Sequence, residues 1–323
     1  MLIYLLAVIV GLAVLAWSSD RFVEGAVGVA RHLGVKPMVI GVVILGFGTS
    51  APEFLVSILS VLEGSSGLAV GNVFGSNIAN IAFILGVTAI VSPIFIQSEI
   101  LRKELPIVLG SVILVGALVW DKELSRMDAL ICVVVFGVAL GYIAFSGKKA
   151  ESDPLESELN NELDGPNWSL VKSIFWLIVG FALLAGSSRG LIWGAVNIAE
   201  LYGVSDLVIG LTIVAIGTSL PELASTIAAA RKGEHEMAFG NILGSNLFNT
   251  LAVSGVAGLV RPLQVESVFL TRDLPINIGL TAVLFLLGWG RKSKGSINRF
   301  EGALLAIFFA SYMGYLVFNA LGE

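Results

Sequence analysis

Two glutamates stand in apolar stretches of the chain, inside nearly identical seven-residue segments. "GTSAPEF" at Gly48–Phe54 contains Glu53, and "GTSLPEL" at Gly217–Leu223 contains Glu222. On an α-helix, hydroxyls three and four residues before each glutamate share its face. These hydroxyl residues are Thr49, Ser50, Thr218 and Ser219. Each segment therefore gathers carboxylate and hydroxyl oxygens, a ligand set that suits hard cations such as Ca²⁺ or Na⁺.

A second pair of motifs adds further oxygen atoms. "GNVFGSNIAN" begins at Gly71 and "GNILGSNLFN" begins at Gly240. In each motif a serine and an asparagine four residues apart share a helix face. These residues are Ser76, Asn80, Ser245 and Asn249. No histidine or cysteine accompanies them, which argues against zinc or copper. Close packing of helices through small polar residues is the alternative interpretation.

Pro52 and Pro221 predict a break in the helix that carries each glutamate. A proline removes a backbone donor and clashes with the carbonyl four residues earlier. The freed carbonyls, near Gly48 and Gly217, would need a partner inside a membrane, and a cation is one such partner. An ionised glutamate without a cation would cost on the order of several kcal/mol and would tend to become protonated. A protonated glutamate held within a helix bundle is the structural alternative.

The composition places these motifs in a polytopic, all-α membrane protein. The 323 residues are 56% hydrophobic and 13% charged, with a mean hydropathy of +0.92. Apolar runs long enough to cross a bilayer follow one another along the chain. We predict ten transmembrane helices at 2–30, 37–62, 67–91, 104–120, 127–146, 168–199, 204–230, 236–259, 272–290 and 298–320. The single cysteine, Cys132, lies in an apolar run and is expected to fill the core.

The motifs recur at one constant offset, which indicates an internal duplication. The spacing from Gly48 to Gly217 equals the spacing from Gly71 to Gly240, and 11 of 20 positions are identical between 34–53 and 203–222. Five spans separate equivalent positions, so the two halves cross the membrane in opposite directions. We predict a first repeat at 1–146 with helices 1–5, a solvated cytoplasmic linker at 147–167, and a second repeat at 168–323 with helices 6–10. Helices 2 and 7 are the predicted broken helices.

Basic residues set the predicted orientation. With the N-terminus outside, inner loops hold thirteen Lys and Arg residues and outer loops hold four. The positive-inside rule therefore predicts a multi-pass protein of the cell (inner) membrane with both termini facing outward.

Other titratable residues are weaker site candidates. Asp20, Arg21, Glu24 and Arg189 interrupt the long first and sixth spans; we place them at the membrane edge, although they could line a solvent path. Glu104 and Asp273 are expected at the interface. His32 and His235 fall near loops and are expected to be solvated.

The paired "GTSxPE" and "GNxxGSNxxN" motifs resemble the two α-repeats of the cation/calcium exchanger superfamily, in particular compact prokaryotic sodium/calcium exchangers. The resemblance covers nearly the whole chain. It implies cation ligands at Thr49, Ser50, Glu53, Ser76, Asn80, Thr218, Ser219, Glu222, Ser245 and Asn249, with backbone carbonyls from Gly46 and Ala215. It also implies that the first and sixth spans slide as a unit, which gives alternating access. Some relatives carry aspartate at the position of Asn249, so the asparagine here argues against potassium co-transport.

The resulting hypothesis is a sodium/calcium antiporter in which Na⁺ and Ca²⁺ compete for the site built on Glu53 and Glu222. A proton/calcium antiporter is the nearest alternative; a cation channel and a purely structural or receptor-like protein are weaker ones. No nucleophile–base pair, phosphate loop or transition-metal cluster indicates an enzyme. The expected partners are the two ions and the lipid bilayer, without cofactor or nucleic acid, and the protein is expected to work as a monomer.

Overall fold

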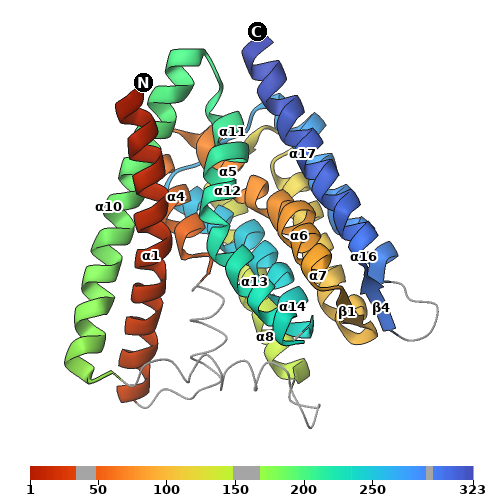
Figure 1. The fold of residues 1–323 in the computed structure, drawn as a ribbon. Coiled ribbons are helices and arrows are strands. Elements are labelled where there is room, and N and C mark those ends of the chain that lie inside the picture. Colours follow the sequence, from red (N-terminus) through yellow and green to blue (C-terminus); the bar gives the residue numbers. More distant parts are fainter. Residues whose placement is uncertain (34–48, 148–167, 234, 289–293, 323) are drawn as a thin grey trace.

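The fold is that of a helical bundle, taken from a computed structural model that describes residues 1–33, 49–147, 168–233, 235–288 and 294–322 (Figure 1). The predicted linker after Gly147, the Gly46 carbonyl and most of the first half of the predicted 37–62 span lie outside these residues. The N-terminus and the end of the last helix lie at the same end of the molecule (Figure 1).

Helices account for most of the described chain. The α-helices are α1 (Leu2–His32), α4 (Ala51–Leu62), α5 (Ser66–Ile78), α6 (Leu85–Val91), α7 (Ser98–Leu118), α8 (Arg126–Gly147), α10 (Leu170–Tyr202), α11 (Asp206–Ile209), α12 (Ala215–Thr218), α13 (Leu220–Lys232), α14 (His235–Leu247), α15 (Ser254–Val260), α16 (Leu274–Gly288) and α17 (Arg299–Gly322). Four π-helical segments connect some of them: η2 (Ala79–Ile84), η3 (Gly210–Val214), η4 (Phe248–Val253) and η5 (Phe269–Asp273).

The described helices confirm a multi-pass membrane protein but give fewer certain crossings than ten. Within the described ranges, seven helical segments are long and apolar enough to span a membrane, and α11–α13 make an eighth as a bent pair. The other two predicted spans, 37–62 and 104–120, overlap α4, which has 12 residues, and α7, which has 21. Residues before α4 lie outside the described part, and the first two turns of α7 carry four charged residues.

The internal duplication recurs in the boundaries of the helices. The run α5–η2–α6 covers 66–91 and the run α14–η4–α15 covers 235–260. Every internal boundary of the second run is displaced from its equivalent by the same offset that relates the sequence motifs. The two halves of the sequence therefore fold locally in the same way, including the position of the π-helical turn.

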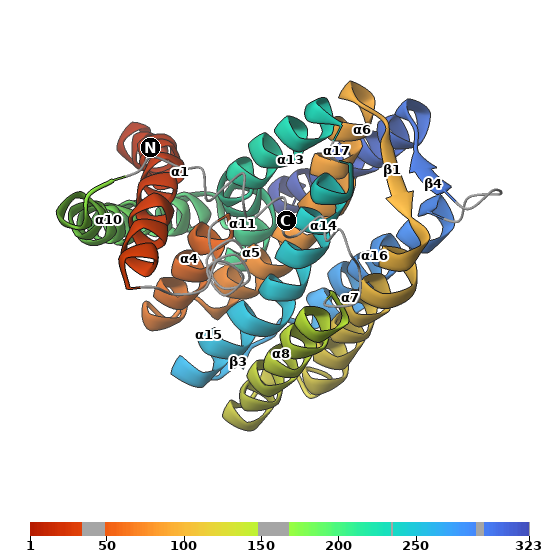
Figure 2. The same ribbon diagram turned by 90° about the horizontal axis from the view of Figure 1, so that it is seen from below.

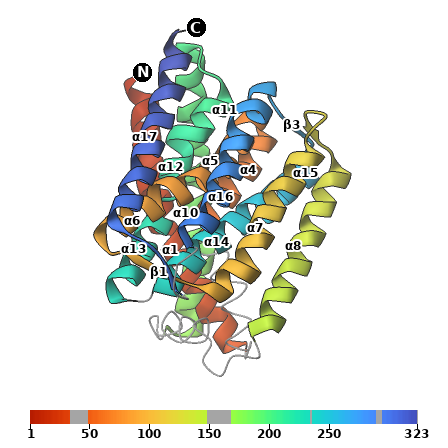
Figure 3. The ribbon, with the colours of Figure 1, turned by 90° about the vertical axis from the view of Figure 1, so that its right-hand side faces the viewer.

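Two small antiparallel strand pairs close opposite ends of the bundle. Strand β1 (Ile94–Gln97) pairs with β4 (Lys294–Ile297), and β2 (Glu123–Leu124) pairs with β3 (Leu263–Gln264). The first residues of β1 and β3 are equivalent under the internal repeat, yet these strands lie at opposite ends of the molecule (Figure 3).

Helices α1 and α10 pack along each other and lie to one side of the remaining bundle (Figure 2). Their interface is close because glycines occupy it: a Cβ atom at Gly25 would lie 2.4 Å from the backbone nitrogen of Leu177. At Gly194, a Cβ atom would lie 2.7 Å from the carbonyl oxygen of Tyr4. The pair shares a hydrophobic core with parts of α4, α11 and η3, separate from the larger core of the other helices. Cys132 is buried in that larger core, as predicted.

Candidate cation site

Two helix starts position the glutamates. Ser219 precedes α13 with φ −86° and ψ 9°, and Ser50 precedes α4 with φ −92° and ψ 11°, so the two turns have nearly the same backbone conformation. A proline follows in the first turn of each helix, where its missing N–H costs least. The predicted break in the seventh span is confirmed, because α11–α12 and α13 meet at 44° there. Glu53 and Glu222 lie in the first turns of α4 and α13, where the helix dipole favours a carboxylate.

The two halves meet through reciprocal hydrogen bonds between serines and glutamates. Ser50 Oγ donates to Glu222 Oε1 at 3.0 Å, and Ser219 Oγ donates to Glu53 Oε1 at 3.0 Å. Both carboxylates are fully buried. They also lie near enough for their charges to repel each other. Each glutamate is therefore held by the helix start that belongs to the other half of the chain.

The predicted hydroxyl residues surround this centre. Thr49 lies beside the carboxylate of Glu222, whereas Thr218 and Ser76 lie beside that of Glu53. The hydroxyls of Ser76 and Thr218 are 3.5 Å apart and both side chains are buried. These contacts bring residues from α4, α5, α12 and α13 to one place.

The predicted asparagines lie in the π-helical turns. Asn80 is in η2, which packs against α13, and Asn249 is in η4, which packs against α4. Each asparagine thus lies on a turn that packs on the helix carrying the glutamate of the opposite half. Extra-residue turns of this kind are frequent at functional sites, because they re-aim side chains without ending the helix.

Among the residues that the structure describes, no hydrogen bond joins the glutamates to two further predicted ligands, Ser245 and Ala215. Ser245 is buried in α14, and within the described chain no hydrogen bond joins its hydroxyl to the centre. Ala215 begins α12, and its carbonyl accepts bonds from the Thr218 hydroxyl at 3.3 Å and the Ser219 backbone N–H at 3.2 Å.

The unpaired polar atoms at the centre are mostly oxygen atoms. Glu53 Oε2, Glu222 Oε2, Asn80 Oδ1 and Asn249 Oδ1 are buried and have no hydrogen-bond partner within the described ranges. Buried polar groups normally have partners, and buried acceptor oxygens that lack donors can be satisfied by a cation. Two carboxylates with hydroxyl and amide oxygens fit Ca²⁺ or Na⁺. Among the described residues, no cluster of three or more His, Cys, Asp or Glu side chains could hold a metal instead.

The sequence interpretation missed residues that hold the ligand set in place. Asn72 donates to the backbone carbonyl of Glu53 at 3.0 Å and to Ser57 Oγ at 2.9 Å, while its oxygen accepts from Thr218 at 3.1 Å. Asn77 and Asn246 are also buried and hydrogen-bonded around the site. The sequence carried a signal for all three asparagines, because they belong to the repeated "GNxxGSNxxN" motif. The sequence interpretation selected only the serine and the last asparagine of that motif as ligands.

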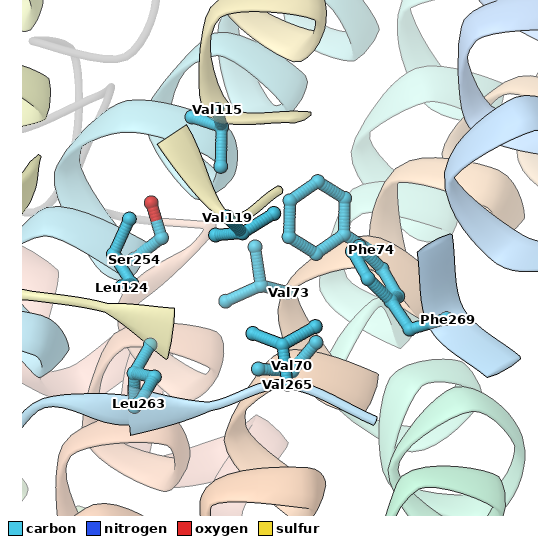
Figure 4. A pocket seen from close by; sticks show the side chains of 10 residues that line it. All are labelled: Val70, Val73, Phe74, Val115, Val119, Leu124, Ser254, Leu263, Val265 and Phe269. Atoms are coloured by element: carbon cyan, nitrogen blue, oxygen red, sulfur yellow. The ribbon is translucent and has the colours of Figure 1, made fainter. Parts of the chain in front are cut away.

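The pocket in Figure 4 is distinct from this centre. Its volume is about 10 Å³, roughly the space that one water needs, and its lining is apolar except for Ser254 (Figure 4). Neither glutamate lines it, so it is a packing defect between α5, α7 and the segments that carry β2 and β3.

Some charged residues outside the centre pair with neighbouring side chains. Asp273, expected at the interface, is fully buried within the protein and accepts bonds from Tyr312 Oη and Arg272 Nε, both at 2.6 Å. The sequence did not reveal this burial, because it depends on how α17 packs over the start of α16. Arg21 and Glu24 form an ion pair at 2.6 Å within α1. His235, expected to be solvated, packs instead against the ring of Phe95, with ring centroids 5.0 Å apart.

Comparison with known proteins agrees with this geometry. The family model described as "Sodium/calcium exchanger protein" matches residues 3–145 and 172–318. The inner membrane protein YrbG of Escherichia coli is 36% identical over 321 residues, which cover 98% of this chain and 97% of the relative. The sodium/calcium exchanger MaX1 of Methanosarcina acetivorans is 32% identical over 352 residues, covering 97% and 98%.

A solved structure of the sodium-calcium exchanger NCX_Mj, soaked with 10 mM Na⁺ and no Ca²⁺, matches with a TM-score of 0.63. It is 31% identical and the match covers 97% of this chain and 98% of that one. A more distant relative, the Ca²⁺/H⁺ antiporter ChaA of Bacillus subtilis, is 25% identical over 303 residues, covering 87% and 84%.

A bundle of apolar helices around a buried, oxygen-rich centre is the arrangement of an ion transporter. The chain belongs to the sodium/calcium exchanger family. The predicted family and the prediction that the protein is no enzyme are both confirmed, since the members of this family are transporters.

Proposed function

We propose that this protein is a sodium/calcium antiporter in which Na⁺ and Ca²⁺ compete for the site built on Glu53 and Glu222. The reciprocal bonds of Ser50 and Ser219 carry the proposal, because they leave one unpaired oxygen on each carboxylate at the same buried centre of the described chain. One Ca²⁺ or two Na⁺ neutralise two carboxylates. A centre without cations would leave like charges buried together, which opposes the conformational switch and so prevents a leak.

We also propose ten transmembrane helices, arranged as two inverted repeats at 1–146 and 168–323, with both termini outward. The placement of β1 and β3 at opposite ends supports the inversion, and the two chain ends at one end of the molecule suit an even number of spans. Alternating access follows if α1 and α10 slide together past the other helices. Their separate packing against each other supports this movement.

Calcium uptake into proteoliposomes tests the function directly. With pH held equal on both sides, an outward-directed Na⁺ gradient should drive Ca²⁺ uptake by the wild-type protein. Glu53→Gln and Glu222→Gln should each lose Ca²⁺ transport while the protein still folds, because either change removes a charge on which the cation depends. Glu63→Gln is the matched control, since Glu63 is exposed at the end of the same helix as Glu53.

A proton/calcium antiporter is the second candidate, favoured by the likeness to ChaA and by the ability of two buried carboxylates to take up protons. It predicts Ca²⁺ uptake driven by a pH gradient in the absence of Na⁺. If Ca²⁺ uptake needs only the pH gradient, the coupling ion is the proton and not Na⁺. Downhill Ca²⁺ flux without any counter-ion would instead indicate a channel.

A further inference from the structure

Four buried asparagines form two pairs related by the internal repeat. Asn77 and Asn80 belong to the first half, and Asn246 and Asn249 are their equivalents in the second half. Only Asn80 and Asn249 were identified as candidate ligands. The other two, Asn77 and Asn246, stand three residues before them, on the same stretches of helix.

On one side of the site, hydrogen bonds fix the orientation of the Asn80 amide. The side-chain nitrogen of Asn246 donates to the backbone carbonyl of Asn77 at 3.4 Å, which leaves the Asn246 oxygen as an acceptor. That oxygen accepts from the side-chain nitrogen of Asn80 at 2.9 Å. Because the Asn80 nitrogen is used in this way, its oxygen points elsewhere, and this oxygen is one of the buried acceptors without a partner in the described chain.

On the other side the equivalent bond is not formed. The repeat relates the Asn80–Asn246 bond to a bond from the Asn249 nitrogen to the Asn77 oxygen. Both of these atoms are buried, and neither has a hydrogen-bond partner among the residues that the structure describes. Asn77 instead donates its own nitrogen to Thr250 Oγ1 at 2.7 Å. The Asn249 nitrogen and the Asn77 oxygen, which the repeat would join, therefore both remain unpaired, as does the Asn249 oxygen.

We propose that Asn246 and Asn77 are positioning residues that turn the oxygens of Asn80 and Asn249 toward the cation in alternate conformations of the transporter. In the present conformation Asn246 orients Asn80. In the opposite one, Asn77 releases Thr250 and orients Asn249. This inference rests on the proposed function and adds to it the residues that set ligand orientation.

The physical reason is the two-sided nature of an amide. An asparagine that turns its NH₂ group to a cation repels it, whereas its oxygen binds, so affinity depends on which way the amide is held. Loss of an outer partner that orients a metal ligand typically lowers metal affinity by about 10–100-fold. A bond made in only one conformation also favours that conformation over the other.

Leucine variants test the proposal, because leucine has nearly the shape of asparagine but no acceptor. Ca²⁺ uptake by Asn246→Leu and by Asn77→Leu is measured in proteoliposomes, with Ca²⁺ supplied at either face in turn. We expect the KM for Ca²⁺ to rise about tenfold or more at one face for Asn246→Leu and at the opposite face for Asn77→Leu. The kcat should change much less.

Asn277→Leu is the matched control. Asn277 is equally buried and also donates its nitrogen to a backbone carbonyl, that of Phe74 at 3.2 Å. Within the described ranges it forms no hydrogen bond with the four asparagines. Its variant should leave the KM at both faces unchanged. Equal KM increases at both faces for Asn246→Leu, or an equal increase for Asn277→Leu, would overturn the proposal.

A double-mutant cycle separates orientation from packing. In an Asn80→Ala background, Asn246→Leu should raise the KM little further, because the side chain that it orients is gone. An undiminished effect would contradict the proposal. Absence of transport in the wild type would refute the proposed function instead.

Discussion

At the scale of single residues, the serines that precede α4 and α13 have two roles. Ser50 and Ser219 stand directly before the first residues of α4 and α13, and each also donates to the glutamate of the other half. A hydroxyl that donates to one carboxylate oxygen keeps the other oxygen free and fixes the direction in which it points. The glutamates therefore depend for their orientation on residues that are distant in the sequence.

Ser50→Ala and Ser219→Ala should raise the KM for Ca²⁺ by similar factors, about tenfold or more each. A hydrogen bond to a charged group contributes roughly 1.5–3 kcal/mol, and about 1.4 kcal/mol corresponds to a tenfold change. Ser60→Ala is the control, because Ser60 is buried on α4 but donates within its own helix to Val56 at 2.7 Å. Uptake kinetics that change as much for Ser60→Ala as for Ser50→Ala would argue against this role.

At the scale of helices, the close contact of α1 and α10 matters for movement. Glycines such as Gly25 and Gly194 let the two long helices approach closely, and the proposed mechanism requires that the two helices move as one body. Neither helix supplies any of the proposed ligands. Their expected influence is therefore on the rate of exchange and not on the affinity for the ion.

Gly25→Val should slow exchange by about tenfold or more and leave the KM for Ca²⁺ within roughly threefold of the wild type. The added side chain would collide with the backbone of α10, and overpacking of this kind typically costs about 1–3 kcal/mol. Gly186→Ala on α10 is the control, because a Cβ atom there meets nothing within 4 Å among the described residues. Uptake rates of the two purified variants check the expectation, and a normal rate for Gly25→Val would speak against a coupled α1–α10 unit.

At the scale of the whole molecule, the two halves act as repeat-related parts around one centre. The strand pairs at opposite ends and the crossed packing of η2 on α13 and η4 on α4 both reflect this relation. In the proposed inverted arrangement, a site placed between the halves lies near mid-membrane, where each half can close one of its two sides. The orientation of the molecule then decides which ion meets the site from which compartment.

Cysteine labelling measures this orientation. In a Cys132→Ala background, Asp121→Cys should react with an impermeant maleimide on intact cells, since Asp121 lies in a predicted outer loop. Lys232→Cys should react only after the membrane is opened, since it lies in a predicted inner loop. Both positions are exposed, and the native cysteine is buried. Labelling in the reverse pattern would invert the proposed topology.

The sequence by itself determined what depends on local chemistry and on counting. Apolar runs, the constant offset between the repeated motifs and the oxygen-bearing residues around Glu53 and Glu222 are all readable along the chain. They are readable because helical periodicity and duplication are properties of the order of residues alone. The break at Ser219 followed from the proline beside it in the same way.

Only the tertiary structure decided which side chains meet across the repeat. Hydrogen bonds from Ser50 to Glu222 and from Asn80 to Asn246 join residues 172 and 166 positions apart, and the burial of Asp273 depends on where α17 packs. Such pairings are set by the packing of whole helices, which no local pattern specifies. The same packing left one asparagine pair bonded and its equivalent unbonded, although the two motifs carry the same glycines, serine and asparagines.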